Sequence, residues 1–154
     1  STAATIVKPS QRELAELVGW EPATALDIER AVDEVLERGS VRAVVASRGP
    51  SGALLAIRGE GATWFRPPPV RPVSTVGAGD SMVAGIAASL FRGSDLEEAV
   101  RHGVAAGTAA VLTPGTELCE RDDVERFVGQ VTVTGSHTRA HGDRRRSDPG
   151  QRAH

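Results

Sequence analysis

The sequence has one cysteine, Cys119, among 154 residues. A single thiol excludes an intrachain disulfide and cannot form a zinc site alone, so we expect Cys119 to be a small buried or half-buried apolar side chain. No apolar run approaches the roughly 20 residues of a membrane-spanning helix. The amino-terminal residues also lack a basic and then hydrophobic signal segment. These absences favour a cytoplasmic protein with no membrane partner.

Lysine is almost absent too, since Lys8 stands alone beside seventeen arginines. The net charge of −2 is uneven: residues 136–154 hold five Arg against two Asp, which leaves about −5 on the rest. A mildly acidic body gives no reason to expect a nucleic-acid partner. Residues 135–154 have almost no apolar content, so we expect a disordered tail whose three histidines could at most scavenge metal weakly. The chain also runs almost immediately from its first residue into a predicted strand, so we expect it to be part of a longer protein.

The remaining residues, 1–134, have the composition and the alternating patterns of one α/β domain. Strands are predicted at 5–8, 41–47, 53–57 and 61–66, with a further strand-like approach at 73–76. Helices are predicted at 10–18, 24–38, 94–112 and 121–128, and a further helix begins directly after residues 77–80. Capping-box spacing marks two of these starts, at Ser10 with Glu13 and at Ser94 with Glu97, and Gly39 marks a helix end.

Residues 74–85, with the sequence STVGAGDSMVAG, carry the clearest functional signal. The glycines allow the backbone to approach a ligand closely, and successive N–H groups at a helix start can bind one anion. An Asp placed there would repel a phosphate unless a hydroxyl awaiting deprotonation lay between them, so the pattern suits phosphoryl transfer with Asp80 as base. The simpler alternative is that Asp80 only favours the helix start and the glycines only turn the chain. A dinucleotide-binding module is disfavoured because no G-x-G-x-x-G unit is present.

This stretch resembles the second signature of the PfkB/ribokinase family of carbohydrate kinases, which positions 74–87 fit without a mismatch. The resemblance implies a ribokinase-like three-layer α/β/α fold. It also implies that Asp80 is the catalytic base and that the backbone N–H groups of Gly77, Ala78 and Gly79 form the anion hole.

The family's K-P-N-x-x-E segment resembles residues 8–13, KPSQRE, with Ser10 in place of the family Asn. The resemblance implies that Lys8 and Ser10 contact the nucleotide and that Glu13 helps to organise Mg²⁺ through water. A hydroxyl has less hydrogen-bonding capacity than an amide, so Ser10 puts this positioning in question. The alternatives from the residues alone are a capping box for Ser10 and Glu13 and a solvated strand end for Lys8.

Two further segments match the family less specifically. The S-x-G-x-x-G of residues 47–52 is by itself a hairpin pattern, but its resemblance to the family's nucleotide loop implies that Ser47, Gly49 and Gly52 contact the nucleotide. The small-residue helix 94–112 is by itself best explained by close packing on the signature helix. The resemblance adds Val104 and Thr108 as nucleotide neighbours. It also implies a possible K⁺ site around Ser74, Val76, Ala110, Thr113, Gly115 and Glu117.

The resemblance runs from about residue 6 to residue 128 and covers only the C-terminal half of such a kinase, nearest the minor-type 6-phosphofructokinase branch. It implies ATP with Mg²⁺, and fructose 6-phosphate as first substrate, with fructose 1-phosphate or tagatose 6-phosphate next. It implies a homodimer for a full-length protein. Because the sugar-binding half is not visible, the alternative is a truncated, non-catalytic nucleotide-binding module. We also expect an exposed sheet edge and an apolar face where that half would lie.

Overall fold

The computed structural model describes residues 5–74, 76–112 and 121–135, and it centres on one five-stranded sheet with the order β1-β2-β3-β4-β5. The strands are β1 (Ile6–Val7), β2 (Ala43–Ser47), β3 (Ala53–Ile57), β4 (Gly61–Arg66) and β5 (Thr132–Gly135). Strand β1 pairs with β2 in parallel, and every later pair is antiparallel.

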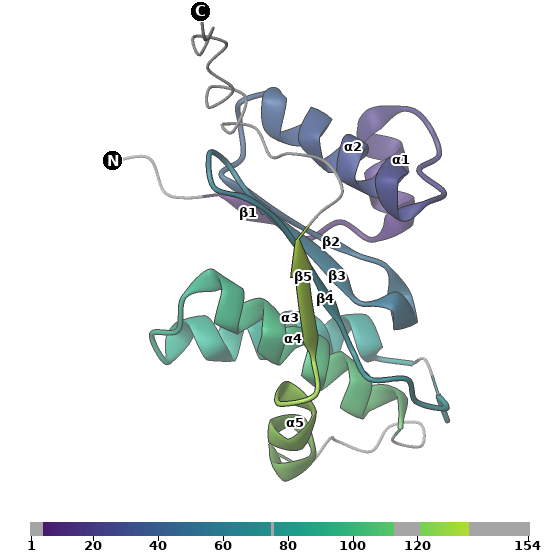
Figure 1. Cartoon of the computed structure of the whole chain (residues 1–154), viewed down its shortest axis with the longest axis vertical. Helices are drawn as coiled ribbons and strands as arrows, with labels where there is room; N and C mark the ends of the chain where they lie inside the picture. Colours follow the sequence, from purple (N-terminus) through teal and green to yellow (C-terminus); the bar gives the residue numbers. More distant parts are fainter. Residues whose placement is uncertain (1–4, 75, 113–120, 136–154) are drawn as a thin grey trace, which may run out of the picture.

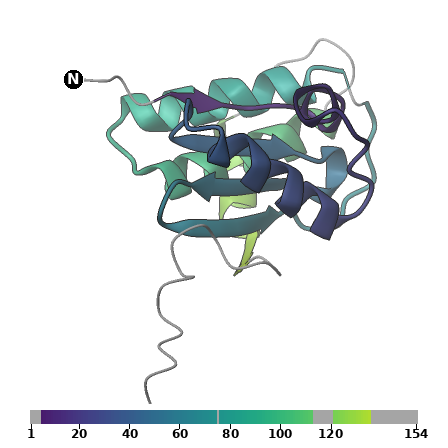
Figure 2. The same ribbon diagram turned by 90° about the horizontal axis from the view of Figure 1, so that it is seen from above.

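Helices cover both faces of this sheet (Figures 1 and 2). One layer holds α1 (Gln11–Val18) and α2 (Ala25–Glu37). The other holds α3 (Ala78–Phe91), α4 (Leu96–Val111) and α5 (Arg121–Val128), and a short 3-10 turn (Gly49–Ser51) joins β2 to β3. The predicted three-layer α/β/α architecture is confirmed.

Strands β2 and β3 are buried on both faces because each alternates its side chains between two apolar cores. Val44 and Ala46 face the core formed with α1 and α2, whereas Val45 faces the core formed with α4 and α5. Trp64 and Phe65 of β4 divide in the same way. These near-continuous apolar runs therefore fix the middle layer between two helical layers.

Helices α1 and α2 both start at complete capping boxes. The Ser10 hydroxyl accepts a hydrogen bond from Glu13 N at 3.2 Å, and Ser10 N donates to Glu13 Oε1 at 3.1 Å. Thr24 and Asp27 repeat the arrangement at α2. Gly39, with φ of +85°, follows α2 in the left-handed conformation that suits a helix end. The predicted box at Ser10 and the predicted stop at Gly39 are confirmed.

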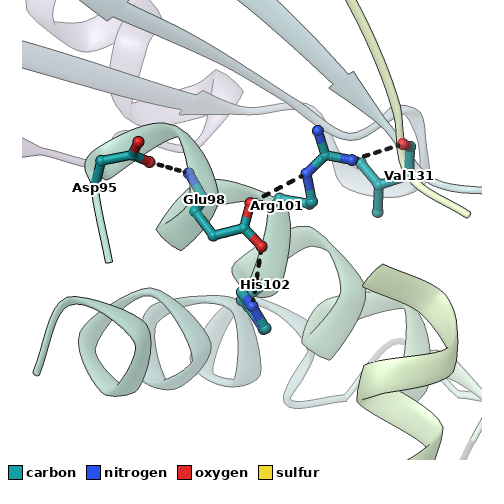
Figure 3. Close-up of polar contacts among 5 residues, drawn as sticks. All are labelled: Asp95, Glu98, Arg101, His102 and Val131. Atoms are coloured by element: carbon teal, nitrogen blue, oxygen red, sulfur yellow. Dashed lines mark hydrogen bonds and ion pairs between the residues drawn. The ribbon is translucent and has the colours of Figure 1, made fainter. Parts of the chain in front are cut away.

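The predicted capping box at Ser94 and Glu97 is wrong by one residue. Asp95 is the N-cap of α4, and its carboxylate accepts from Glu98 N at 2.8 Å. The Glu98 side chain points along the helix instead, where it pairs with Arg101 at 3.6 Å and with His102 at 3.3 Å (Figure 3). Arg101 also donates to the Val131 carbonyl at 3.5 Å, which ties α4 to the segment before β5.

Helices α3 and α4 pack side by side through glycines. A Cβ built on Gly103 would lie 2.5 Å from Ile86 Cγ1 and 3.0 Å from the Met82 carbonyl oxygen. A Cβ on Gly85 would lie 3.0 Å from the Ala106 side chain. The small residues of α4 thus serve the close helix packing that the sequence favours on its own.

The structure differs from the sequence-based prediction at two segments, and other predictions lie outside the described residues. The strand-like approach to the signature is not a strand in its described residues: Val73 and Ser74 bond to the end of α4, and Val73 is 63% exposed. Strand β5 was not predicted, although the alternation of Val131, Thr132, Val133 and Thr134 is a strand pattern. Cys119 and the tail from residue 136 lie outside the described residues. Within the described part of the chain, no helix is long and apolar enough to cross a membrane.

Candidate active site at the carboxyl edge of the sheet

Three loops that carry candidate residues meet at one edge of the sheet. Strand β1 is parallel to β2, and β3 is antiparallel to both β2 and β4, so β1, β2 and β4 all end at the same edge. Residues 8–10, 48–52 and 67–77 follow these three strands. Ligands of open α/β sheets bind outside the carboxyl ends of the strands, so this edge is the candidate site.

The first two loops are joined directly. Ser47 N donates to the Pro9 carbonyl at 3.1 Å, and the Ser47 hydroxyl lies 3.5 Å from the same oxygen. Lys8 immediately precedes this contact and is half-buried. The structure therefore brings Lys8, Ser10 and Ser47 together at one corner of the edge.

The third loop is fastened to the end of α4. Val73 N and Ser74 N donate to the Val111 carbonyl at 2.6 and 3.0 Å, and the Ser74 hydroxyl accepts from Val76 N at 3.2 Å. The Val111 carbonyl was missed by sequence analysis because a backbone acceptor leaves no mark on residue identity. Its effect is to hold the signature loop where the chain enters α3.

The start of α3 presents unpaired backbone donors. Gly77 is the N-cap, with φ of +79° and no side-chain cap, so the N–H groups of Ala78, Gly79 and Asp80 have no partner within the helix. The helix dipole adds partial positive charge at the same place. Asp80 lies in this first turn, is exposed and forms no ion pair or hydrogen bond with the described residues. The arrangement combines donors for an anion with a carboxylate open to a substrate.

Glu13 is also exposed, but its carboxylate already has a structural role. The Ser10 backbone N–H, followed by the Ser10 hydroxyl, lowers the pKa of Glu13 below its ordinary value. Only Oε1 accepts the N–H of Ser10. The capping alternative for Ser10 and Glu13 is thus confirmed, and a role in organising Mg²⁺ stays a prediction.

The loop of residues 48–52 forms the hairpin that its pattern predicts on its own. Arg48 N donates to the Gly52 carbonyl at 2.8 Å, and β2 and β3 pair on either side. A Cβ on Gly52 would lie 1.9 Å from the Phe65 carbonyl oxygen, whereas a Cβ on Gly49 would meet nothing within 4 Å. Gly52 is therefore required by the approach of β4, while Gly49 faces open space at the candidate edge.

Two predicted nucleotide neighbours are covered by the protein. Val104 is buried in the core on the α4 face, and the buried Thr108 hydroxyl donates to the Val104 carbonyl at 2.9 Å. Their contact with a nucleotide stays a prediction. Of the possible K⁺ set, Ser74, Val76 and Ala110 lie at or next to the joined ends of the signature loop and α4. Thr113, Gly115 and Glu117 lie outside the described residues. Among the described residues, no group of three or more His, Cys, Asp or Glu could hold a metal ion.

Comparison with known proteins identifies the architecture. Residues 1–123 match the model of the pfkB family carbohydrate kinases. The chain belongs to this family. It is 46% identical over 127 residues to the ATP-dependent 6-phosphofructokinase isozyme 2 of Escherichia coli, covering 82% of this chain and 41% of the relative. It is 35% identical over 135 residues to a 1-phosphofructokinase of Borreliella burgdorferi, covering 86% of this chain and 42% of the relative.

Solved structures of two kinases agree with this fold. Phosphofructokinase-2 from E. coli in complex with potassium has a TM-score of 0.75 and 45% identity, covering 81% of this chain and 40% of that one. Arabidopsis thaliana ribokinase with ribose and ATP has a TM-score of 0.72 and 30% identity, covering 80% and 40%. The ribokinase-like fold is confirmed. The chain spans only about two fifths of the length of these relatives.

Proposed function

We propose that this chain is the nucleotide-binding and catalytic part of an ATP-dependent cytoplasmic kinase that phosphorylates a hexose phosphate. Fructose 6-phosphate, converted to fructose 1,6-bisphosphate, is the preferred substrate. The observation that carries the proposal is Asp80, exposed in the first turn of a helix whose start has no side-chain cap. The name of the E. coli relative supports the choice of ATP and fructose 6-phosphate.

The proposed reaction is an in-line transfer of the γ-phosphoryl group. Asp80 accepts the proton of the sugar hydroxyl as that oxygen bonds to the γ-phosphorus, and the bond to the bridging oxygen breaks to release ADP. The backbone N–H groups of Gly77, Ala78 and Gly79 stabilise the charge on the moving phosphoryl group. Lys8, Ser10, Ser47 and Gly49 border the nucleotide at the same edge of the sheet.

Two cations accompany the proposal. Glu13 suits an indirect role toward Mg²⁺, because its side chain is exposed and, of its two carboxylate oxygens, only Oε1 accepts the Ser10 N–H. When bound with ATP, Mg²⁺ would neutralise phosphate charge. Ser74, Val76 and Ala110 would contribute to a K⁺ site, and the potassium complex of the E. coli structure supports this assignment.

A second candidate substrate is fructose 1-phosphate, favoured by the likeness to 1-phosphofructokinase, with tagatose 6-phosphate as a further choice. A second candidate function is a nucleotide-binding module without catalysis. It is favoured by Ser10 in place of the family Asn and by the coverage of only 41% of the relative. Without a sugar site, Asp80 would have no positioned hydroxyl to deprotonate.

The test is ADP formation by this chain with Mg-ATP and K⁺, in the presence of fructose 6-phosphate, fructose 1-phosphate or no sugar. Asp80→Asn is the test variant, and Glu97→Gln, an exposed acid in the first turn of α4, is the matched control. Sugar-dependent ADP formation that only Asp80→Asn abolishes would support the kinase. Mg-ATP binding without turnover would favour the nucleotide-binding module, and turnover in Asp80→Asn would overturn the role of Asp80.

Ser10 is tested separately by calorimetry of Mg-ATP binding. If the hydroxyl has weakened the site, Ser10→Asn binds Mg-ATP more tightly than the unmodified chain. Equal affinities would make serine an acceptable equivalent at this position.

A further inference from the structure

The negative charge of this protein is concentrated in the layer that holds α1 and α2. Residues 10–40 contain eight carboxylates and three arginines, a net charge of −5, whereas the rest of residues 1–135 sums to zero. One of these carboxylates, Glu29, is buried and accepts the Trp64 indole N–H, but the others are exposed or half-buried. The outer surface of this layer is therefore strongly acidic.

Two contacts hold the end of α1 against the second half of α2. The Arg38 guanidinium donates to the Leu17 carbonyl at 2.6 Å, and the Trp20 indole N–H donates to Glu34 at 3.2 Å. These contacts gather glutamates from both helices in one region. Four of them define what we name the α1–α2 acidic surface (Glu16, Glu21, Glu34 and Glu37).

The cations of the same layer do not neutralise this surface. Arg12, Arg30 and Arg38 are the only basic side chains between residues 10 and 40. Arg12 lies 3.7 Å from Glu16, but the two side chains are 91% and 70% exposed, so water screens the pair and it contributes little. The α1–α2 acidic surface can therefore accept further positive charge.

The basic end of the chain starts near this surface. Strand β5 runs in the direction opposite to β2, so it ends at the edge of the sheet where β2 begins. Helix α2 ends at the same edge, because Gly39 and the next residues lead into β2. In Figure 1 the arrow of β5 points toward the side that α1 and α2 cover. Three strand spacings, about 14 Å, separate β5 from the strand that follows α2.

Residues 136–154, which lie outside the described residues, carry the complementary charge. They hold five arginines against two aspartates, a net charge of +3, and three of the arginines are consecutive at 144–146. Arg144 is nine residues beyond Gly135, so it can lie up to about 30 Å from it. That reach exceeds the length of α2, about 20 Å for 13 residues. The α1–α2 acidic surface is thus within reach of the arginines.

We propose that the arginines at 144–146 dock on the α1–α2 acidic surface of the same chain. Their guanidinium groups pair with its glutamates, and Leu17, which is 44% exposed next to Glu16, contacts the aliphatic parts of the arginine side chains. Docking through exposed ion pairs is strongest at low ionic strength and is released by salt. A segment on a short tether has an effective concentration on the order of millimolar, which favours this occupant over the same segment of a second copy.

The test is paramagnetic relaxation in the full chain, with Cys119→Ser and a nitroxide attached at Ser147→Cys. In about 10 mM salt, where the screening length is about 30 Å, we expect the amide signals of residues 16–21 and 34–38 to weaken at least about twofold. They should recover in about 1 M salt, where that length is about 3 Å. The triple variant Arg144→Gln, Arg145→Gln, Arg146→Gln should restore them at low salt.

Two pairs of substitutions separate this surface from the net charge of the chain. Glu21→Gln with Glu37→Gln removes two charges from the α1–α2 acidic surface and should reduce the weakening at least about twofold. Glu97→Gln with Glu125→Gln removes the same charge from α4 and α5 in the other helical layer, and this matched control should leave the weakening unchanged. All four glutamates are exposed, so neither pair disturbs a core, and the amide spectrum shows directly that each variant is folded.

Three results would overturn the proposal: no weakening at the α1–α2 acidic surface, weakening that persists in high salt, or the same response in both pairs of glutamate variants. A mixture of isotope-labelled chain without nitroxide and unlabelled chain with nitroxide detects docking between copies. Weakening in that mixture would assign the arginines to a second copy and would also overturn the proposal. No readout depends on nucleotide or turnover, so the result is independent of the kinase assignment.

Discussion

The indole N–H of Trp64 donates a 2.8 Å hydrogen bond to Glu29 Oε1, and both side chains are almost completely buried. The indole N–H of the other tryptophan, Trp20, donates in the same way to Glu34 at 3.2 Å, but this hydrogen bond is only partly buried. Helix α2 thus anchors an indole from β4 in the core and a second indole near the surface.

This pair of contacts gives a matched prediction for stability. Glu29→Ala would leave the buried indole N–H without this acceptor and open a cavity, costing about 2 to 4 kcal/mol of unfolding free energy. Glu34→Ala removes a more solvent-exposed hydrogen bond and would cost less than about 1 kcal/mol of unfolding free energy. Urea denaturation of both variants measures the difference, and equal losses would contradict the role of burial.

The β2–β3 hairpin supplies a second prediction. Gly52→Ala places a Cβ against the Phe65 carbonyl at a residue with φ of +99°, so β4 must move away. Gly49→Ala keeps a positive φ of +52° but meets open space. We expect Gly49→Ala to cost about 1 kcal/mol and Gly52→Ala several times more. Thermal unfolding of the two variants tests this prediction. Similar melting temperatures would show that β4 moves away from the added Cβ at little cost in stability.

The contact between α3 and α4 supplies a third prediction for stability. Gly103→Ala would press a Cβ onto Ile86 and the Met82 carbonyl, and the expected loss is about 1 to 3 kcal/mol. Gly107→Ala is the control, because its nearest neighbour would be the Ala78 carbonyl at 3.4 Å. That spacing is ordinary contact, and alanine favours a helix over glycine by about 1 kcal/mol, so Gly107→Ala should be neutral or stabilising. Destabilisation by both, measured by urea denaturation, would argue against a specific glycine contact at 103.

The capping box of α1 makes stability depend on pH. The pKa of Glu13 is lowered by the backbone N–H and then the hydroxyl of Ser10, so the ionised carboxylate favours the folded state. This contribution is complete above the unfolded pKa of about 4.3 and is lost as the pH falls through the lower folded value. Ser10→Ala removes the hydroxyl but keeps the backbone N–H, so in this variant the pKa of Glu13 should rise only part of the way toward its ordinary value, as followed by NMR of the side-chain carboxyl carbon.

The second capping box provides the control for that titration. The pKa of Asp27 is lowered chiefly by the backbone N–H of Thr24, and then by that of Ala23. The pKa of Asp27 should not move in Ser10→Ala, and it should rise only slightly in Thr24→Ala, which removes the smaller contribution of the Thr24 hydroxyl and keeps both backbone N–H groups. A Glu13 pKa unchanged by Ser10→Ala would mean that the Ser10 hydroxyl does not contribute to lowering it.

Local sequence signals determined much of this protein. Capping residues set the starts of α1 and α2, and unbroken apolar runs set β2 and β3. These signals are local, because each one depends only on residues close to it in the sequence. The segment predicted at 61–66 is β4 with the same bounds. The signature at residues 74–87 also indicated the pfkB family, since its glycines and Asp80 stand at fixed spacing.

Only the tertiary structure decided how these pieces meet. Strand β5 exists because residues 132–135 find β4, some seventy residues earlier in the chain, and no local pattern states that pairing. The Val111 carbonyl holds Val73 and Ser74, and the Phe65 carbonyl dictates glycine at 52, although neither acceptor has any mark in the sequence. Backbone groups are the same at every residue, so their partners follow from where the folded chain places them.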